Sequence, residues 1–469
     1  MLALCLQGTI VLSVSKRMTK RTVMTEAIWI KDPMAILADG AERGIVVADG
    51  AIVELVAKGK EPATAAKPFE ARDHVAIPGL INTHHHFYQT LTRAVPAALD
   101  RELFPWLKAL YPIWAKMTPE ALDAAVTVAM AELMLSGCTT TTDHHYVFPK
   151  GLEDGIDIEI AAAKRLGIRT LLTRGSMNLS ERDGGLPPDS VVQDEDTILA
   201  DSKRLVDRHH QRGDAAMTQV ALAPCSPFSV TTALMKSTAA LADKLDVRLH
   251  THLAETEDEN KFCEQLYGVR PLDYLEDCGW LNSRTWLAHG VHFRADEMPR
   301  LAKGGVSISH CACSNQTLGS GTCPVCDLEA AGVSIGLGVD GSASNDESNL
   351  MQEVRAAFLL QRGRYGVLKV SHKDALRWAT KGSAACVGRP ELGEIAVGKR
   401  ADLALFKLDE LRFSGHGDPL AALVLCGAHR ADRVMVNGHW TVQDGVIPGL
   451  DLAGLMRRHQ AAARMVQGS

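Results

Sequence analysis

Histidine and carboxylate residues follow several short apolar runs, and their types and spacing suit a metal site. His84 and His86 follow the first run, His252 lies in the fifth, and Asp340 follows the eighth. Alternate side chains of an extended chain share one face, so His84 and His86 point the same way while His85 points away. An isolated His-x-His pair is two solvated histidines about as often as it is a metal site. Three imidazoles with one carboxylate, in contrast, suit Zn²⁺ or Fe²⁺. We therefore predict one divalent metal ion with a position left for water.

Two further residues stand where they would act on that water. Glu255 lies three residues after His252, and it would carry a proton from a water whose pKa the metal lowers to about 7. The alternative is a solvated glutamate that opens a helix. His289 ends the sixth run and would polarise the water or stabilise a developing oxyanion, unless it is a satisfied histidine of the fold. Asp340 would be both a metal ligand and a hydrogen-bond acceptor for the water, so the predicted catalytic residues are Glu255, His289 and Asp340.

These residues need a scaffold that brings the ends of distant strands together. Eight β-branched runs alternate with helical patterns, which predicts an α/β fold whose parallel sheet closes into a (β/α)8 TIM barrel. The alternative is an open doubly wound sheet, but that fold usually carries a glycine-rich loop after its first strand, where this chain has histidines. Barrels hold their chemistry at the carboxyl ends of the strands, which is where the candidate residues fall. The predicted strands are 75–83, 139–145, 169–176, 219–225, 248–254, 285–291, 306–311 and 334–339.

Both ends of the chain have a different residue pattern from the region of the eight runs. Short alternating runs surround Asp49-Gly50 near the start and Asn437-Gly438 near the end, and both dipeptides predict tight hairpins. We therefore expect a small β module at each end.

Composition limits the classes of partner. The 469-residue chain has 50 Lys+Arg against 56 Asp+Glu, a net charge of −6, so no basic excess indicates nucleic acid or a membrane surface. No apolar run reaches membrane-spanning length. Eleven cysteines, an odd number, argue for a reducing compartment, and the apolar start precedes its basic residues, the reverse of a signal peptide. We expect a cytoplasmic protein with a small-molecule partner.

The motif set resembles the metal-dependent amidohydrolases of the cytosine-deaminase-like subgroup. The resemblance implies that both chain ends form one composite β-sandwich, with residues 26–77 and 390–469 beside a barrel of residues 78–389, and with 1–25 as a possible extension. It also implies a single metal, because the fourth run carries no lysine to bridge a second, and a homo-oligomer by analogy. The matching segments are 78–86, 252–255, 287–289, 309–310, 314–315, 338–341 and 393–402.

Within this subgroup, Gln89 resembles the residue found in guanine deaminases and triazine hydrolases. A side-chain amide can pair with the edge of a heterocycle, although a surface glutamine is the alternative. An arginine typical of guanine deaminases is missing from 219–221, whereas segments 102–106, 143–146 and 223–228 look most like 8-oxoguanine deaminases. The resemblance therefore implies hydrolysis of 8-oxoguanine to urate and ammonia. Isoxanthopterin, guanine and s-triazines are alternative substrates, and a non-catalytic ligand-binding barrel is the distant alternative.

Four other residues are weaker candidates for contacts with the heterocycle. Trp106 stacks on the ring as part of a lid or belongs to the core stripe of a helix, two interpretations of equal weight. Arg174 leads into a long loop after the third run. At most one of His144 and His145 faces the pocket, and Cys225 ends the fourth run.

Overall fold

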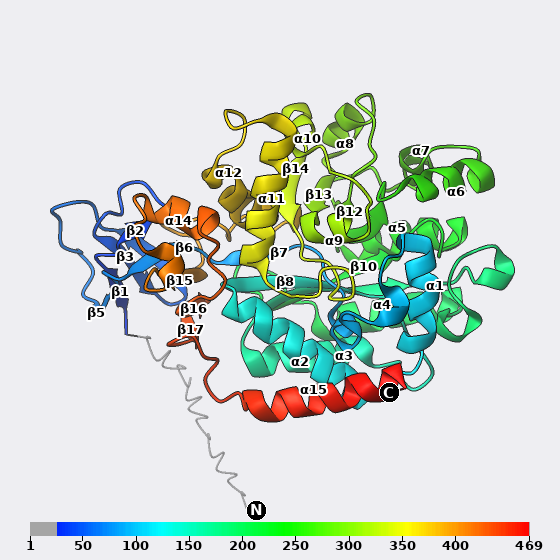
Figure 1. The fold of residues 1–469 in the computed structure, drawn as a ribbon, viewed down its shortest axis with the longest axis horizontal. Helices are drawn as coiled ribbons and strands as arrows, with labels where there is room; N and C mark the ends of the chain where they lie inside the picture. The colour runs from blue at the N-terminus through cyan, green and yellow to red at the C-terminus, as the bar shows by residue number, and fades with distance from the viewer. Residues whose placement is uncertain (1–25, 469) are drawn as a thin grey trace, which may run out of the picture.

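The computed structural model describes residues 26–468, and a closed parallel barrel forms its centre (Figure 1). The strand order β10-β11-β12-β13-β14-β7-β8-β9 is sequential around the ring, so the predicted (β/α)8 barrel is confirmed. The predicted extension, 1–25, lies outside the described residues. The barrel strands are β7 (Leu80–Asn82), β8 (Cys138–His145), β9 (Arg169–Ser176), β10 (Thr218–Pro224), β11 (Leu249–Leu253), β12 (Thr285–His289), β13 (Ser307–His310) and β14 (Ser334–Leu337).

The first predicted strand, 75–83, is in fact two strands. Its first half is β6 (His74–Pro78) in a small sheet, and its second half is β7 in the barrel. The chain changes sheets at Gly79, whose N–H donates to the Asp402 carbonyl at 2.8 Å. A Cβ at this position would lie 2.3 Å from the Thr139 side chain, so the crossing requires glycine.

Helices cover the outside of the barrel and connect its strands. Several begin at residues whose side chains accept a backbone N–H, such as Thr118 before α2 and Thr231 before α5. The helices are α1 (Leu103–Trp114), α2 (Pro119–Leu135), α3 (Gly155–Leu166), α4 (Glu195–His209), α5 (Thr232–Leu245), α6 (Glu257–Tyr267), α7 (Pro271–Asp277), α8 (Met298–Gly304), α9 (Ala312–Thr317), α10 (Val325–Ala331), α11 (Leu350–Tyr365), α12 (His372–Arg377), α13 (Ser383–Cys386), α14 (Pro419–Leu425) and α15 (Leu452–Gln467). No helix in residues 26–468 is long and apolar enough to cross a bilayer.

Two small sheets lie beside the barrel and share one apolar core. One has the order β4-β3-β1-β5 and the other β17-β16-β15-β6-β2, so strands from both chain ends build the unit, as predicted. Ile45 and Ile52 of the first sheet pack with Leu403 and Met435 of the second. Their strands are β1 (Ile28–Lys31), β2 (Ala35–Ile36), β3 (Gly44–Ala48), β4 (Ala51–Leu55), β5 (Lys67–Glu70), β15 (Leu403–Lys407), β16 (Arg433–Val436) and β17 (His439–Val442).

The sandwich and the barrel are joined by buried contacts. Arg169 at the start of β9 forms a two-pronged ion pair with Asp402 beside β15, at 2.9 and 3.1 Å. The boundaries 26–77 and 390–469 remain a prediction, with one difference in this structure. Helix α15 lies along α2 of the barrel (Figure 1), and His459 on it contacts the Thr90 hydroxyl at 3.1 Å.

Candidate active site

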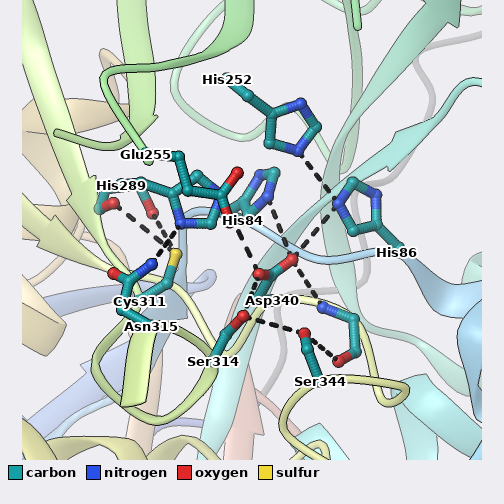
Figure 2. Close-up of polar contacts among 12 residues, drawn as sticks. His84, His86, His252, Glu255, His289, Cys311, Ser314, Asn315, Asp340 and Ser344 are labelled. Atoms are coloured by element: carbon teal, nitrogen blue, oxygen red, sulfur yellow. Dashed lines mark hydrogen bonds and ion pairs between the residues drawn. The ribbon is translucent and has the colours of Figure 1, made fainter. Parts of the chain in front are cut away.

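The four predicted metal ligands converge at the carboxyl ends of three strands. His84 and His86 lie just past β7, His252 lies in β11, and Asp340 follows β14. Asp340 Oδ1 is 3.3 Å from His84 Nε2 and 3.2 Å from His86 Nε2, and the Nε2 atoms of His86 and His252 are 3.2 Å apart. Figure 2 shows these side chains pointing toward one common point.

A relay of hydrogen bonds fixes the tautomer of His84. The Trp286 carbonyl lies 2.8 Å from His250 Nδ1, so that nitrogen carries the proton and donates. His250 Nε2 is then the acceptor for His84 Nδ1, at 2.8 Å. The Nε2 atom of His84 is therefore left with a bare lone pair, and it has no hydrogen-bond partner.

The other two imidazoles are fixed in the same sense. His86 Nδ1 donates to the His144 carbonyl at 2.7 Å, and His252 Nδ1 donates to the Cys225 carbonyl at 2.6 Å. Carbonyls that hold Nδ1–H and leave Nε2 free are the usual outer partners of metal-binding histidines. Three Nε2 lone pairs and a carboxylate oxygen that face each other repel unless a cation lies between them, so this donor set fits a divalent metal ion.

The charge states of the ligands agree with this interpretation. Burial lowers the pKa of His84 and of His252 well below the ordinary value, which keeps both rings neutral. Burial alone would raise the pKa of Asp340, but its close contacts with the His84 and His86 rings outweigh burial and lower that pKa well below its usual range. Neutral imidazoles and an ionised carboxylate are the forms that bind metals.

The backbone is strained where the strands end at this site. Ala254, His289 and Asp340, which follow or end β11, β12 and β14, have φ values of 54°, 75° and 63°. Residues other than glycine rarely adopt this left-handed region, and such strain persists where surrounding contacts enforce it. For Asp340 these contacts are Ser314 Oγ at 2.6 Å and the Gly341 N–H at 2.7 Å.

Glu255 is held beside the ligands by a residue that sequence reasoning missed. The carboxylate of Glu259 accepts the backbone N–H groups of Ala254 and Glu255 at 3.0 and 2.9 Å. Burial, together with the charges of Asp340 and Glu259, raises the pKa of Glu255 well above its ordinary value. A carboxyl group whose pKa is raised holds a proton more readily than an exposed one, which suits proton transfer.

His289 presents an N–H to the same space. Asn315 Nδ2 donates to His289 Nδ1 at 3.0 Å, so the ring proton lies on Nε2, which is 3.5 Å from Glu255 Oε2 and 3.9 Å from Asp340 Oδ2. Burial lowers the pKa of His289 to about 4. A neutral ring with Nε2–H toward the site can donate to a developing oxyanion.

His86, His252, Asp340, Glu255 and His289 line one cavity with about 360 Å³ of empty space. Gln89, Trp106 and Cys225 line it, as do Tyr146 and Phe228, which were not predicted individually. Gln89 Oε1 is buried without a hydrogen-bond partner. A Cβ on Gly341 would lie 1.9 Å from that oxygen, so the glycine after Asp340 makes room for the amide.

Two predicted substrate contacts lie elsewhere. Arg174 points out of the barrel wall, where it pairs with Asp201 of α4 at 2.9 Å and stacks over Phe148. His144 points inward, but its ring stacks on His252 with 4.7 Å between centroids, and its Nε2 donates to the Ala223 carbonyl. Neither side chain lines the cavity. Arg174 is bound by Asp201 on a helix outside the barrel, and His144 packs behind the metal ligand His252.

Comparisons with known proteins agree with this geometry. The model of the amidohydrolase family matches residues 75–441. The chain is 60% identical to an 8-oxoguanine deaminase of Pseudomonas aeruginosa, over 93% of this chain and 98% of that protein. It is 36% identical to an isoxanthopterin deaminase from an unknown prokaryotic organism, over 82% and 84% of the two chains. The crystal structure of an atrazine chlorohydrolase from Arthrobacter aurescens complexed with zinc has a TM-score of 0.87 and 33% identity, covering 94% of this chain and 100% of that chain.

Proposed function

Because the chain belongs to the amidohydrolase family, we propose that it is a hydrolytic deaminase that converts 8-oxoguanine to urate and ammonia. The observation that carries the proposal is that His86, His252 and Asp340 line one cavity together with Glu255, His289 and Gln89, while the ligand atom of His84 lies within 4.8 Å of those of His86 and His252. The substrate is taken from the relative with 60% identity.

We further propose that Zn²⁺ occupies the site formed by His84, His86, His252 and Asp340, with Fe²⁺ as the alternative. The zinc complex of the structural neighbour supports this choice. A divalent ion held there would supply Lewis acidity, which makes a water molecule acidic enough to react near neutral pH.

The side chains of this protein then move the protons. Glu255 takes a proton from the attacking water, whose oxygen forms a bond to the ring carbon bearing the amine. His289 donates from Nε2 to the tetrahedral intermediate. Glu255 returns the proton to the amine, the carbon–nitrogen bond breaks, and ammonia leaves. The raised pKa of Glu255 suits this exchange, since a strongly acidic carboxyl would not reprotonate the leaving group.

The cavity walls suit a flat ring. Trp106, Tyr146 and Phe228 offer apolar faces, and the unpartnered amide oxygen of Gln89 can accept a ring N–H. The Trp106 indole is fixed by donating Nε1–H to the Ala343 carbonyl at 3.2 Å. A heterocycle with an amide-like edge would complete the hydrogen bonds of Gln89.

Ammonia release from 8-oxoguanine, guanine, isoxanthopterin and cytosine tests the proposal, with Zn²⁺-loaded protein and its Asp340→Ala variant as the blank. We expect the largest kcat/KM for 8-oxoguanine and much slower turnover of guanine. A larger value for isoxanthopterin would keep the mechanism and contradict the substrate. If the metal-bound protein released no ammonia from any of the four compounds, the proposed function would be contradicted.

A further inference from the structure

A second cavity lies outside the catalytic cavity, and two leucines line both. We call it the vestibule; polar side chains, among them Glu102, Glu257 and Lys261, form much of its wall. Leu103 and Leu318 line the vestibule and the catalytic cavity alike. Each of these leucines is only 6% exposed. They therefore mark an apolar boundary between a cavity that holds the reacting groups and a polar outer space.

The first leucine is held by a rigid helix. Leu103 begins α1, and Trp106 and Leu107, three and four residues later, line the catalytic cavity from the same face of that helix. The hydrogen bond from Trp106 to the Ala343 carbonyl fixes this first turn. Leu103 is thus positioned by the same contacts that form the cavity wall.

The second leucine is held from both sides. The Leu318 N–H donates to the Ser314 carbonyl at 3.0 Å, and Ser314 itself binds Asp340. Two residues further on, the Ser320 carbonyl accepts from His292 Nε2 at 2.8 Å. His292 Nδ1 faces Glu257 at 3.0 Å. The loop that carries Leu318 is therefore anchored to the catalytic centre and to the vestibule wall.

We propose that Leu103 and Leu318 form a constriction that selects free heterocyclic bases and excludes their ribosides. This inference rests on the proposed deamination of a purine at the catalytic centre. The reacting carbon must reach Glu255 and His289, so the five-membered ring, with the nitrogen that carries ribose in nucleosides, points away from them. A sugar at that nitrogen would press its hydroxyls against two buried leucines, which offer no hydrogen bond and leave those groups desolvated.

The polar wall of the vestibule predicts a gain of activity when the constriction is removed. Beyond the leucines lie the carboxylates of Glu102 and Glu257 and the ammonium group of Lys261, all able to bind sugar hydroxyls. Shortening both leucines to alanine would join the two cavities, with the base in the inner space and the ribose in the outer. The change is therefore expected to add an activity rather than only to remove one.

The test compares 8-oxoguanine with 8-oxoguanosine in the wild type, Leu103→Ala, Leu318→Ala and the double variant. We expect a wild-type kcat/KM for the base at least ~100-fold above that for the riboside. The double variant should raise the riboside value at least ~10-fold. Leu107→Ala is the matched control, because it removes the same atoms from the inner wall alone and should give no riboside turnover. Metal content and melting temperature verify folding.

Two results would overturn the constriction. One is wild-type turnover of the riboside within tenfold of the base. The other is a folded double variant, active on the base, that gains no riboside activity. If the wild type deaminates neither compound, the proposed function has failed, and calorimetry with guanine and guanosine then tests the constriction by itself. Guanosine binding by the double variant alone supports it, and equal guanosine binding by the wild type contradicts it.

Discussion

Two buried clusters of side chains that could bind a metal lie in or beside the barrel, and they differ in which atoms carry protons. The ligand cluster consists of His84, His86, His252 and Asp340, and the wall cluster consists of Asp143, His145 and Glu159. The potential ligand atoms of the wall cluster lie within 4.8 Å of one another, as do those of the three histidines. By residue type alone, both clusters could hold a metal ion.

The wall cluster holds protons on its carboxyl groups. Burial raises the pKa of Glu159 to about 8 and, with the charge of Glu159, raises that of Asp143 well above its usual range. Burial lowers the pKa of His145 to about 4. His145 Nδ1 lies 3.0 Å from Glu159 Oε1, and Asp143 Oδ1 accepts the Phe87 N–H at 2.6 Å. These groups can satisfy each other with their own protons.

The contrast shows that ligand-type residues alone do not make a metal site. In the ligand cluster, carbonyl groups and the relay through His250 bind every Nδ1–H, and His86, His252 and Asp340 line the catalytic cavity. In the wall cluster His145 Nδ1 faces the Glu159 carboxyl group instead, and none of its three residues lines the catalytic cavity. The outer partners and the access to substrate, more than the residue types, separate the two.

Removal of a ligand should have the largest effect and separate the clusters most clearly. We expect His84→Ala and Asp340→Ala to lose the metal and to lower kcat/KM at least ~1000-fold, because the cation then has too few donors. Glu159→Gln, which keeps the shape of the wall cluster, should retain one equivalent of metal. Metal analysis of the purified proteins checks both statements, and a loss of metal in Glu159→Gln would contradict the distinction between the clusters.

Glu255→Gln should keep the metal and remove the proton carrier. The amide is isosteric but cannot accept and return a proton, so we expect kcat to fall ~10²–10⁴-fold with metal content unchanged. Glu264→Gln, an exposed change on α6, is the control and should act as wild type. Near-normal turnover by Glu255→Gln would remove this residue from the mechanism.

The place of the catalytic residues at the strand ends was predictable, because the order of strands and helices predicts the barrel and barrels hold their active sites at that end. Alternation of runs and helices predicts the barrel, and the histidines, Glu255 and Asp340 then fall at one end of it. The spacing of His250 and His252 equals that of His84 and His86, so the relay residue also had a signal in the sequence.

Side-chain partners from distant elements were not predictable. Period-two alternation states that His144 and His145 face opposite ways, but not which one points into the barrel. Arg174 was predicted near the substrate, yet Asp201 on a helix outside the barrel binds it. Glu259 is a local exception, since it lies only four residues after Glu255 and supports it by accepting backbone N–H groups.

A smaller effect is expected when the relay to His84 is interrupted. His250→Phe keeps the bulk of the ring but offers no acceptor to His84 Nδ1, so the bare Nε2 lone pair is no longer enforced. We expect metal affinity to fall ~10–100-fold, the usual cost of a lost outer partner. His250→Gln retains an acceptor and should recover part of the affinity. Competition with a chelator measures the metal affinity of each variant. A wild-type affinity in His250→Phe would show that the fixed tautomer of His84 is not what distinguishes the two clusters.

The smallest effect should be the pH dependence that Glu159 gives to stability. Its pKa is about 8 in the folded protein against an ordinary 4.5. Between these values the folded state binds a proton that the unfolded state lacks, so the free energy of unfolding falls as pH rises, by at most about 1.4 kcal/mol per pH unit. For a chain of this length that corresponds to roughly 1–2 °C in Tm per unit. Glu159→Gln cannot titrate, so between pH 5 and 8 its Tm should fall less steeply than that of the wild type or of Glu264→Gln. Parallel curves would mean that the wall cluster does not store its proton on Glu159, and the contrast with the ligand cluster would lose its electrostatic basis.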